Sequence, residues 1–278
     1  RKAMRNFLTR TASAIVFAAL FLAGLLWHPI AFGVIFSFVI AVMSFEYLRI
    51  TLGKREIVAQ VISVFTNLLL FALFFLMEGY GLNPKWLLTL PVLISLIILS
   101  ALYCKDENGY KSLPFALTSI IYISLPFALT NFIVFGSNGE FNGLILLCIM
   151  IIIWASDVGA YLFGIAFGQK NGHKLFPSIS PKKSWEGYWG GLLLSLAAGY
   201  ALYALNFIQY ELIHVIIISL IINVTSTFGD LAESQLKRNF GVKDSGKIMP
   251  GHGGLLDRFD GALFAFPATV AYIIITTI

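Results

Sequence analysis

Residues 142–168 read NGLILLCIMIIIWASDVGAYLFGIAFG, and Asp157 is the one charged residue among them. About 20 apolar residues are enough for a helix to cross the hydrocarbon core of a bilayer, so this stretch predicts a membrane-spanning helix. The whole chain has the same character, because 58% of its 278 residues are hydrophobic and only 12% are charged. A soluble fold of this composition would expose large apolar patches. The sequence therefore predicts an integral membrane protein.

A carboxylate inside such a span is costly in hydrocarbon and points to function by default. Asp157 admits two interpretations: a residue of a functional site, or a buried acid that is hydrogen-bonded to a neighbouring helix. Further along the segment, Gly159, Gly164 and Gly168 indicate close helix packing, with Gly164 and Gly168 forming a GxxxG motif. Gly187 and Gly191 indicate the same for the next helix.

Apolar runs between polar breaks predict nine membrane-spanning helices and an all-α, polytopic fold. The runs are 13–27, 30–48, 57–77, 86–103, 114–135, 142–168, 187–207, 211–229 and 255–276. We divide the chain into N-terminal membrane helices at 1–103, a middle segment with one span at 104–140, and a C-terminal catalytic region at 141–278. Two long polar loops, at 169–186 and 230–254, lie in the third part.

The first run is short and could instead be the apolar part of a signal peptide. No clear small-residue cleavage site precedes His28-Pro29, however. Pro29 also suits the first turn of a second helix. The sequence therefore favours two consecutive spans here.

The nine-span arrangement places eighteen of the nineteen Lys and Arg residues on one side of the membrane, and only Lys85 on the other. Such a bias marks the cytoplasmic side. We therefore expect a cytoplasmic N-terminus, both long loops in the cytoplasm, and Ile278 on the outside. Merging the first two spans would destroy the bias.

Several classes of protein are excluded. The two cysteines, Cys104 and Cys148, cannot form a disulfide framework, and the four histidines lack the spacing of zinc ligands. The net charge of +5 is spread among membrane segments. We therefore expect anionic substrates rather than a nucleic-acid partner.

Acidic residues cluster at the membrane edge of the last two spans. Asp230 and Glu233 share a helix face with Lys237, and Asp257 and Asp260 share one at the start of the last span. These acids could be solvated ion pairs. Acids that converge beside apolar segments repel one another unless a cation lies between them, and carboxylates alone suit Mg²⁺. We predict a metal site formed by Asp230, Asp257 and Asp260.

Cations and glycines surround these acids and predict a polyphosphate site. The cations are Lys237, Arg238, Lys243, Lys247 and Arg258. The glycine-rich stretch 250–254 precedes a helix N-terminus, where backbone N–H groups and the helix dipole favour phosphate. The upstream loop adds Lys182 and Lys183 beside a Ser-Pro turn, which we interpret as a second anion-binding segment. We assign Lys170 and Lys174 to membrane orientation alone.

These residues match the motifs of a known family. The chain resembles phosphatidate cytidylyltransferases (CDP-diacylglycerol synthases) in Ser234-Gln-Leu-Lys237-Arg238, in Lys243-Asp244-x-Gly246, and in Pro250-x-His252-Gly253-Gly254-x-x-Asp257-Arg258-x-Asp260. Ser180-Pro181-Lys182-Lys183-Ser184-Trp185-Glu186-Gly187 and Asp157-x-x-Ala160-Tyr161 resemble upstream motifs of the same family. Residues 1–140 match only as a hydrophobic profile.

The resemblance implies Mg²⁺-dependent synthesis of CDP-diacylglycerol and pyrophosphate from CTP and phosphatidate, with a second cation left open. It also implies a homodimer in the bacterial inner membrane with a polar cavity facing the cytoplasm. We expect catalytic roles for Asp230, Lys237, Arg238, Asp257 and Asp260. We expect substrate contacts from Ser180, Lys182, Lys183, Lys243, Asp244, Lys247, His252, Gly253, Gly254 and Arg258, of which His252, Gly253 and Gly254 would cradle pyrophosphate.

The residues agree with this chemistry. A phosphate monoester is already an anion at neutral pH, so it needs no general base, and catalysis must come from aligning anions and neutralising their charge. Two alternatives stay open: a CTP-dependent transferase for an isoprenoid or ether lipid, and a transporter with intramembrane carboxylates. A transporter usually shows inverted repeats and midplane sites, whereas these polar groups lie on one side.

Overall fold

The structure, a computed structural model, describes residues 16, 18–54, 56–103, 109–169, 172–248 and 253–277. The chain forms two compact units. Unit 1 comprises Arg1–Asn142 and Phe240–Arg258, and unit 2 comprises Gly143–Asn239 and Phe259–Ile278. The segment Phe240–Arg258 thus belongs to unit 1. The division of the chain at 103 and 140 stays a prediction.

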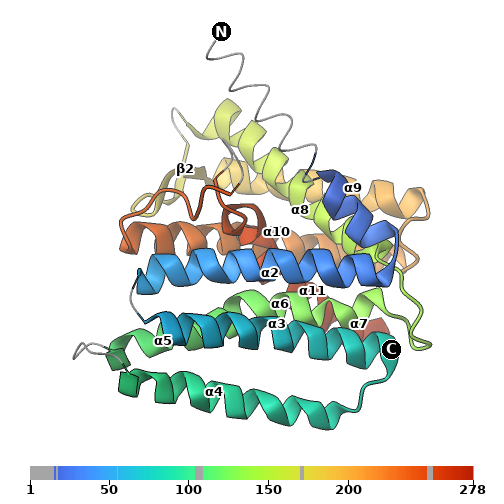
Figure 1. Cartoon of the computed structure of the whole chain (residues 1–278). Helices are drawn as coiled ribbons and strands as arrows, with labels where there is room; N and C mark the ends of the chain where they lie inside the picture. The colour runs from blue at the N-terminus through green and yellow to red at the C-terminus, as the bar shows by residue number, and fades with distance from the viewer. Residues whose placement is uncertain are drawn as a thin grey trace. The chain divides into compact units, whose positions relative to one another are not determined.

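The described part of unit 1 is helical. Its elements are α2 (Pro29–Leu52), α3 (Ile57–Tyr80), the 3₁₀ helix η1 (Pro84–Leu88), α4 (Thr89–Ser100), the 3₁₀ helix η2 (Ala101–Tyr103), α5 (Gly109–Ser119), the π-helix η3 (Ile120–Ser124), α6 (Leu125–Leu129) and α7 (Asn131–Val134) (Figure 1). Phenylalanine rings form its core: the ring of Phe32 lies 4.4 Å from that of Phe36 and 5.9 Å from that of Phe71. Tilted aromatic pairs of this kind stabilise packing beyond their buried area.

Residues at both ends of helix α2 explain where it begins and ends. Pro29 is its first residue, and the Nδ1 atom of His28 accepts a hydrogen bond from the backbone N–H of Ile30 at 3.1 Å. The predicted helix start at Pro29 is therefore confirmed. The helix ends at Gly53, whose φ of 67° lies in the region that favours glycine.

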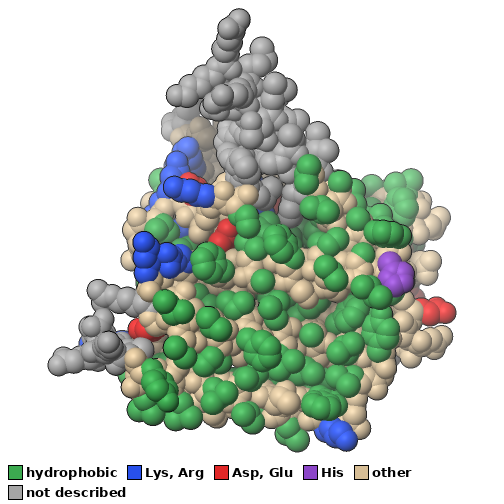
Figure 2. All heavy atoms as spheres, in the orientation of Figure 1, with side chains coloured by type: hydrophobic (Ala, Val, Ile, Leu, Met, Phe, Trp, Pro, Cys, Tyr) green, Lys and Arg blue, Asp and Glu red, His purple; other side chains and the backbone are tan. Residues whose placement is uncertain are grey.

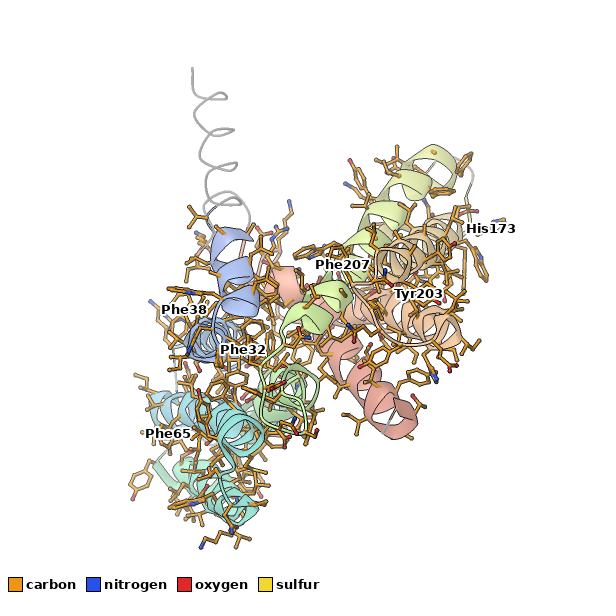
Figure 3. The ribbon with its side chains drawn as sticks, turned by 90° about the vertical axis from the view of Figure 1, so that its right-hand side faces the viewer. Phe32, Phe38, Phe65, His173, Tyr203 and Phe207 are labelled. Atoms are coloured by element: carbon orange, nitrogen blue, oxygen red, sulfur yellow. The ribbon has the colours of Figure 1, made fainter. Side chains whose placement is uncertain are left out.

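The outward faces of these helices are apolar. Phe38 is 60% exposed and Phe65 is 56% exposed, whereas Phe32 is fully buried (Figure 3). Figure 2 shows hydrophobic side chains over much of the visible face. Lipid tails rather than water suit such a surface.

Unit 2 combines helices with one short hairpin. Its elements are α8 (Leu144–Phe163), the π-helix η4 (Gly164–Gly168), β1 (Lys174–Phe176), β2 (Ser180–Ser184), α9 (Trp185–Ala204), α10 (Leu212–Asn239) and α11 (Leu256–Thr277) from Phe259 onward. Helices α8 and α9 pass closely at glycines. A Cβ atom added at Gly159 would overlap the backbone carbonyl of Gly190, and one at Gly187 would meet the carbonyl of Ala160. Close packing at these glycines is confirmed.

Seven helical segments of the described residues are long and apolar enough to cross a membrane. They are Pro29–Leu52, Ile57–Tyr80, Pro84–Tyr103, Tyr110–Val134, Leu144–Gly168, Leu212–Asn239 and Leu256–Thr276. An all-α polytopic membrane protein is therefore confirmed as the fold class. Of the other two predicted spans, 13–27 is described at 16 and from 18 onward, with 18–26 helical, and 187–207 corresponds to α9; neither segment is among the seven.

Both polar connections contain regular secondary structure. The predicted loop 169–186 contains the antiparallel hairpin β1–β2, in which Phe176 pairs with Ser180 and Lys174 with Ser184. The predicted loop 230–254 begins as helix, because α10 continues to Asn239. A polar face with an ion pair one turn apart allows a helix to continue beyond the apolar run.

Candidate active site

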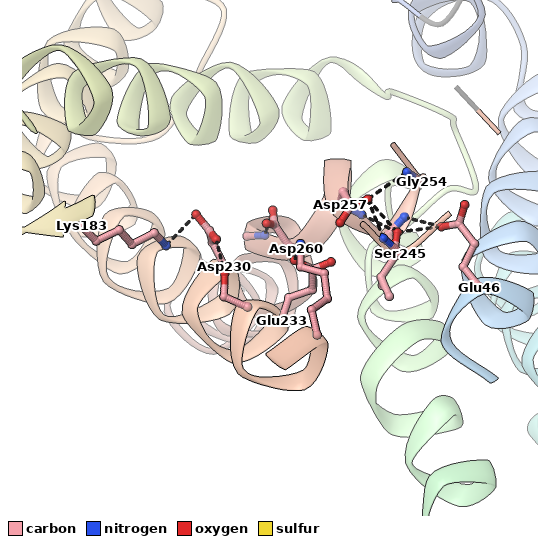
Figure 4. A network of polar contacts seen from close by, with 12 residues as sticks. Glu46, Lys183, Asp230, Glu233, Ser245, Gly254, Asp257 and Asp260 are labelled. Carbon is pink, nitrogen blue, oxygen red and sulfur yellow. Dashed lines mark hydrogen bonds and ion pairs between the residues drawn. The ribbon is translucent and has the colours of Figure 1, made fainter. Parts of the chain in front are cut away.

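The candidate site of unit 2 gathers carboxylates from three helices. Asp157 lies on α8, Asp230 and Glu233 lie one turn apart on α10, and Asp260 lies on α11 (Figure 4). The charges of Asp157, Asp230 and Glu233 all act on Asp260. The structure thus brings together four acids that are separated along the sequence. Of the two interpretations of Asp157, its place in this cluster favours the site.

Two lysines offset part of this negative charge. The Nζ atom of Lys183 lies 2.6 Å from Oδ2 of Asp230, and the Nζ atom of Lys237 lies 2.6 Å from Oε2 of Glu233. The Glu233 side chain is 0% exposed, so its lysine partner is needed to keep a buried carboxylate. The expected helix-face pair of Glu233 and Lys237 is confirmed. The cluster therefore holds four acidic groups and two lysines.

The oxygen donors of these acids suit a divalent cation. Oxygen donors are the ligands that Mg²⁺ prefers, and it commonly uses one or two carboxylates together with waters and substrate phosphates. Within the described ranges, no three Asp, Glu, His or Cys side chains are placed to hold a metal ion by themselves. Asp230 and Asp260 belong to unit 2 and Asp257 to unit 1. A shared metal for all three stays a prediction.

The hairpin positions Lys183. Neighbouring residues of a strand point to opposite faces, and accordingly Lys183 is half-buried against Asp230 while Lys182 is exposed. At the end of the hairpin, the Ser184 hydroxyl accepts from the backbone N–H of Gly187 at 3.2 Å and so caps α9. The sequence analysis treated Lys182 and Lys183 as one anion-binding pair. In the structure their side chains lie on opposite faces of β2.

Hydrogen bonds hold the base of the hairpin. The backbone N–H of His173 donates to Oε1 of Glu186 at 3.0 Å, and the His173 ring lies 3.1 Å from the same oxygen. The backbone hydrogen bond from His173 contributes most to lowering the pKa of Glu186, to about 2. Lys174, assigned to orientation alone, also donates to the carbonyl of Gly168 at 2.9 Å. Lys174 therefore caps the end of η4.

In unit 1, Asp257 organises the segment that carries the signature motif. We name the described residues between α10 and α11, 240–248 and 253–255, the signature loop. The Oδ2 atom of Asp257 accepts three hydrogen bonds of 2.9 Å, from the N–H and hydroxyl of Ser245 and from the N–H of Gly254 (Figure 4). In this structure the Gly254 N–H therefore binds Asp257, whereas the sequence assigned it to pyrophosphate. Gly253 has a φ of 88°, which explains the glycine there.

The other predicted residues divide into three groups. Lys243, Asp244, Lys247, Arg238 and Arg258 are exposed. Ser180 opens strand β2 and is half-buried. His252 and Lys170 lie outside the described residues.

One acidic residue of this region was missed. Glu46, on α2, is 5% exposed, accepts hydrogen bonds from the N–H groups of Leu255 and Leu256, and has its Oε2 atom 3.2 Å from the Ser245 hydroxyl oxygen. The signal was present in the sequence, because Glu46 is the one acid in the apolar run 30–48. The rule that singled out Asp157 applies equally to Glu46.

Comparison with known proteins identifies the family of this chain. The profile of the cytidylyltransferase family matches residues 8–276. The chain belongs to the cytidylyltransferase family. This match confirms the resemblance and extends it through the N-terminal helices, where the sequence had shown only a hydrophobic profile.

Bacterial cytidylyltransferases match over nearly the full length. A phosphatidate cytidylyltransferase of Staphylococcus epidermidis is 31% identical over 264 residues, which cover 93% of this chain and 95% of the relative. One of Staphylococcus saprophyticus is 34% identical over 261 residues, with the same two shares. One of Staphylococcus aureus is 38% identical over 179 residues, or 63% of this chain and 65% of the relative.

Proposed function

We propose that this protein is a phosphatidate cytidylyltransferase, which transfers CMP from CTP to phosphatidate and releases pyrophosphate. The observation that carries the proposal is the match to relatives of that name over 93% of this chain and 95% of theirs. The candidate site agrees with it, since its described groups are carboxylates and lysines suited to phosphates and cations.

The reaction joins two anions. A phosphate oxygen of phosphatidate attacks the α-phosphorus of CTP, and the bond from that phosphorus to the oxygen of the leaving pyrophosphate breaks. Because the attacking phosphate is already ionised, no general base is needed. The protein must instead align the two substrates and neutralise the charge that develops on the leaving group.

The residues of unit 2 fit these tasks. Lys183 and Lys237 supply positive charge, and their pairs with Asp230 and Glu233 hold the ammonium groups in place. Asp230 and Asp260 would hold Mg²⁺, which when bound neutralises phosphate oxygens. In unit 1, the exposed Lys243 and Lys247 would bind a phosphate of the substrate. We further propose that the protein is a homodimer.

The proposal is tested with purified protein, radiolabelled CTP, Mg²⁺ and a panel of lipid phosphates. Label that becomes lipid-soluble with phosphatidate, and not with isoprenoid or ether-lipid acceptors, is the expected result. If only an isoprenoid or ether-lipid acceptor becomes labelled, that lipid and not phosphatidate is the substrate. Absence of labelled lipid together with ion or solute flux in proteoliposomes would favour a transporter instead.

The two lysines of β2 should differ in their effect on activity. Lys183→Ala should lower kcat/KM by about 10- to 100-fold, because the charge beside Asp230 is lost. Lys182→Ala, the same change at the exposed neighbour, should lower it less than about 3-fold. Steady-state kinetics with both substrates measures the difference. Equal losses would show that the hairpin acts through its overall charge.

We propose nine spans in the bacterial inner membrane, with the N-terminus and the site facing the cytoplasm. The charge distribution supports this orientation. In a chain with Cys104 and Cys148 replaced, single cysteines at Ser137 and Ser178 should react with an impermeant thiol reagent from opposite sides. Both residues are exposed, so both should react in detergent as a control. Reaction from the same side in intact membranes would contradict the nine-span arrangement.

A further inference from the structure

Glu46 lies in the interior of unit 1 yet is directed at the polar signature loop. Its Oε1 atom accepts from the N–H of Leu255 at 3.2 Å, and its Oε2 atom accepts from the N–H of Leu256 at 2.9 Å. Leu256 is the first residue of α11 and Leu255 directly precedes it, and a helix leaves its first N–H groups without partners in the helix itself. Glu46 therefore caps α11 from another helix, 210 residues away in sequence.

The same carboxylate also meets the first half of the signature loop. The Ser245 hydroxyl lies 3.2 Å from Oε2 of Glu46 and 2.9 Å from Oδ2 of Asp257. The N–H of Asp257 donates to this hydroxyl at 3.3 Å. Ser245 thus connects the carboxylate of α2 to the carboxylate at the start of α11 (Figure 4).

Two glycines of the signature motif are explained by this contact. A Cβ atom added at Gly246 would overlap the Glu46 carboxylate, and one at Gly254 would overlap both that carboxylate and the Ser245 hydroxyl. Both halves of the loop therefore approach Glu46 more closely than a side chain would allow.

We infer that Glu46 is a positioning residue, which fixes the signature loop so that its exposed Lys243, Asp244 and Lys247 are held ready for CTP. Glu46 touches the loop backbone, and the groups proposed to bind substrate lie on that loop. The inference rests on the proposed function for its kinetic consequence, but the hydrogen bonds that it invokes are independent of that function.

Glu46→Gln is the decisive change because glutamine keeps the shape of the glutamate side chain but replaces one acceptor oxygen with a donor NH₂ group. One oxygen becomes an NH₂ group, which would then face the N–H of Leu255 or Leu256, so one hydrogen bond is lost and one buried donor is left without a partner. We expect the KM for CTP to rise about 10-fold and the KM for phosphatidate to change less than 2-fold. Glu46→Asp keeps the charge on a shorter side chain and should fall between the wild type and Glu46→Gln.

Hydrogen exchange provides a readout that is independent of activity. Amides of residues 243–256 should exchange faster in Glu46→Gln than in the wild type. Glu78→Gln, the same substitution on α3, should leave both exchange and KM unchanged. Asn67→Ala serves as a stability control, because Asn67 bonds Ser44 and Ser119 in the interior of unit 1 and no described contact joins it to the loop.

Wild-type exchange and wild-type KM values in Glu46→Gln would overturn the inference. So would a rise in both KM values that simply follows the melting temperature, as in Asn67→Ala. A wild-type protein that transfers no CMP to phosphatidate would overturn the proposed function, while faster exchange in Glu46→Gln would still support the contact.

Discussion

Asp230→Asn and Asp260→Asn are each expected to lower turnover by at least about 100-fold, or about 3 kcal/mol of transition-state stabilisation. Asn has nearly the shape of Asp but lacks its charge and one strong ligand oxygen, so a bound cation would be weakened. Folding should survive, because the change relieves repulsion among the four acids of unit 2. The ion pair of Asp230 with Lys183 is partly exposed, and such pairs contribute little to stability.

The measurement is turnover at several Mg²⁺ concentrations beside thermal stability in detergent. Glu140→Gln, the same kind of change at an exposed acid of unit 1, should alter neither. Asn variants that unfold earlier but keep wild-type turnover per folded molecule would contradict a role in cation binding. They would indicate structural ion pairs instead.

Asp257 should behave differently from Asp230 and Asp260. Its Oδ2 atom accepts three hydrogen bonds from the signature loop, so an NH₂ group at that position would oppose three donors. We expect Asp257→Asn to lose both turnover and thermal stability. The sequence treated the three acids as equivalent metal ligands, and this contrast separates them.

The single members of the acidic cluster of unit 2 could be identified from the sequence, but the meeting of Asp157 with the others could not. Asp157 was identified as a charge inside an apolar run, and Asp230 with Glu233 by their spacing of three on a helix. These signals are local, because helical geometry relates residues three or four apart wherever the helix lies. The helical spacing of Asp230, Glu233 and Lys237 also indicated that the helix continues past the apolar run 211–229, and α10 does continue to Asn239.

The partners of these acids could not be predicted in the same way. The contact of Lys183 with Asp230 depends on the register of a five-residue strand that contains Pro181. Proline is confined to edge strands and strand starts, so the segment looked like a loop. The bond between Glu46 and Ser245 spans 199 residues. No periodicity relates positions so far apart, and the chain must fold before they meet.

Gly159→Ala is expected to lower the melting temperature by up to about 5 °C, although alanine favours helix over glycine by about 1 kcal/mol. The added Cβ would overlap the carbonyl oxygen and carbon of Gly190. A backbone obstacle cannot rotate away, so α8 and α9 must separate, and overpacking of this kind costs about 1–3 kcal/mol. Asp157 is two residues from Gly159, and turnover should fall as well.

Gly164→Ala provides the matched control in the same segment. Its nearest neighbour across the interface, the Cα atom of Gly187, would lie 3.9 Å from the new Cβ atom, which is an ordinary van der Waals contact. Helix propensity alone predicts that both alanine substitutions stabilise the protein. The packing instead predicts that Gly164→Ala stabilises it and Gly159→Ala destabilises it. Thermal unfolding of both variants in one detergent decides between them. A Gly159→Ala variant as stable as Gly164→Ala would show that α8 and α9 do not pack through Gly159, because tight contact and added volume cannot both be tolerated there.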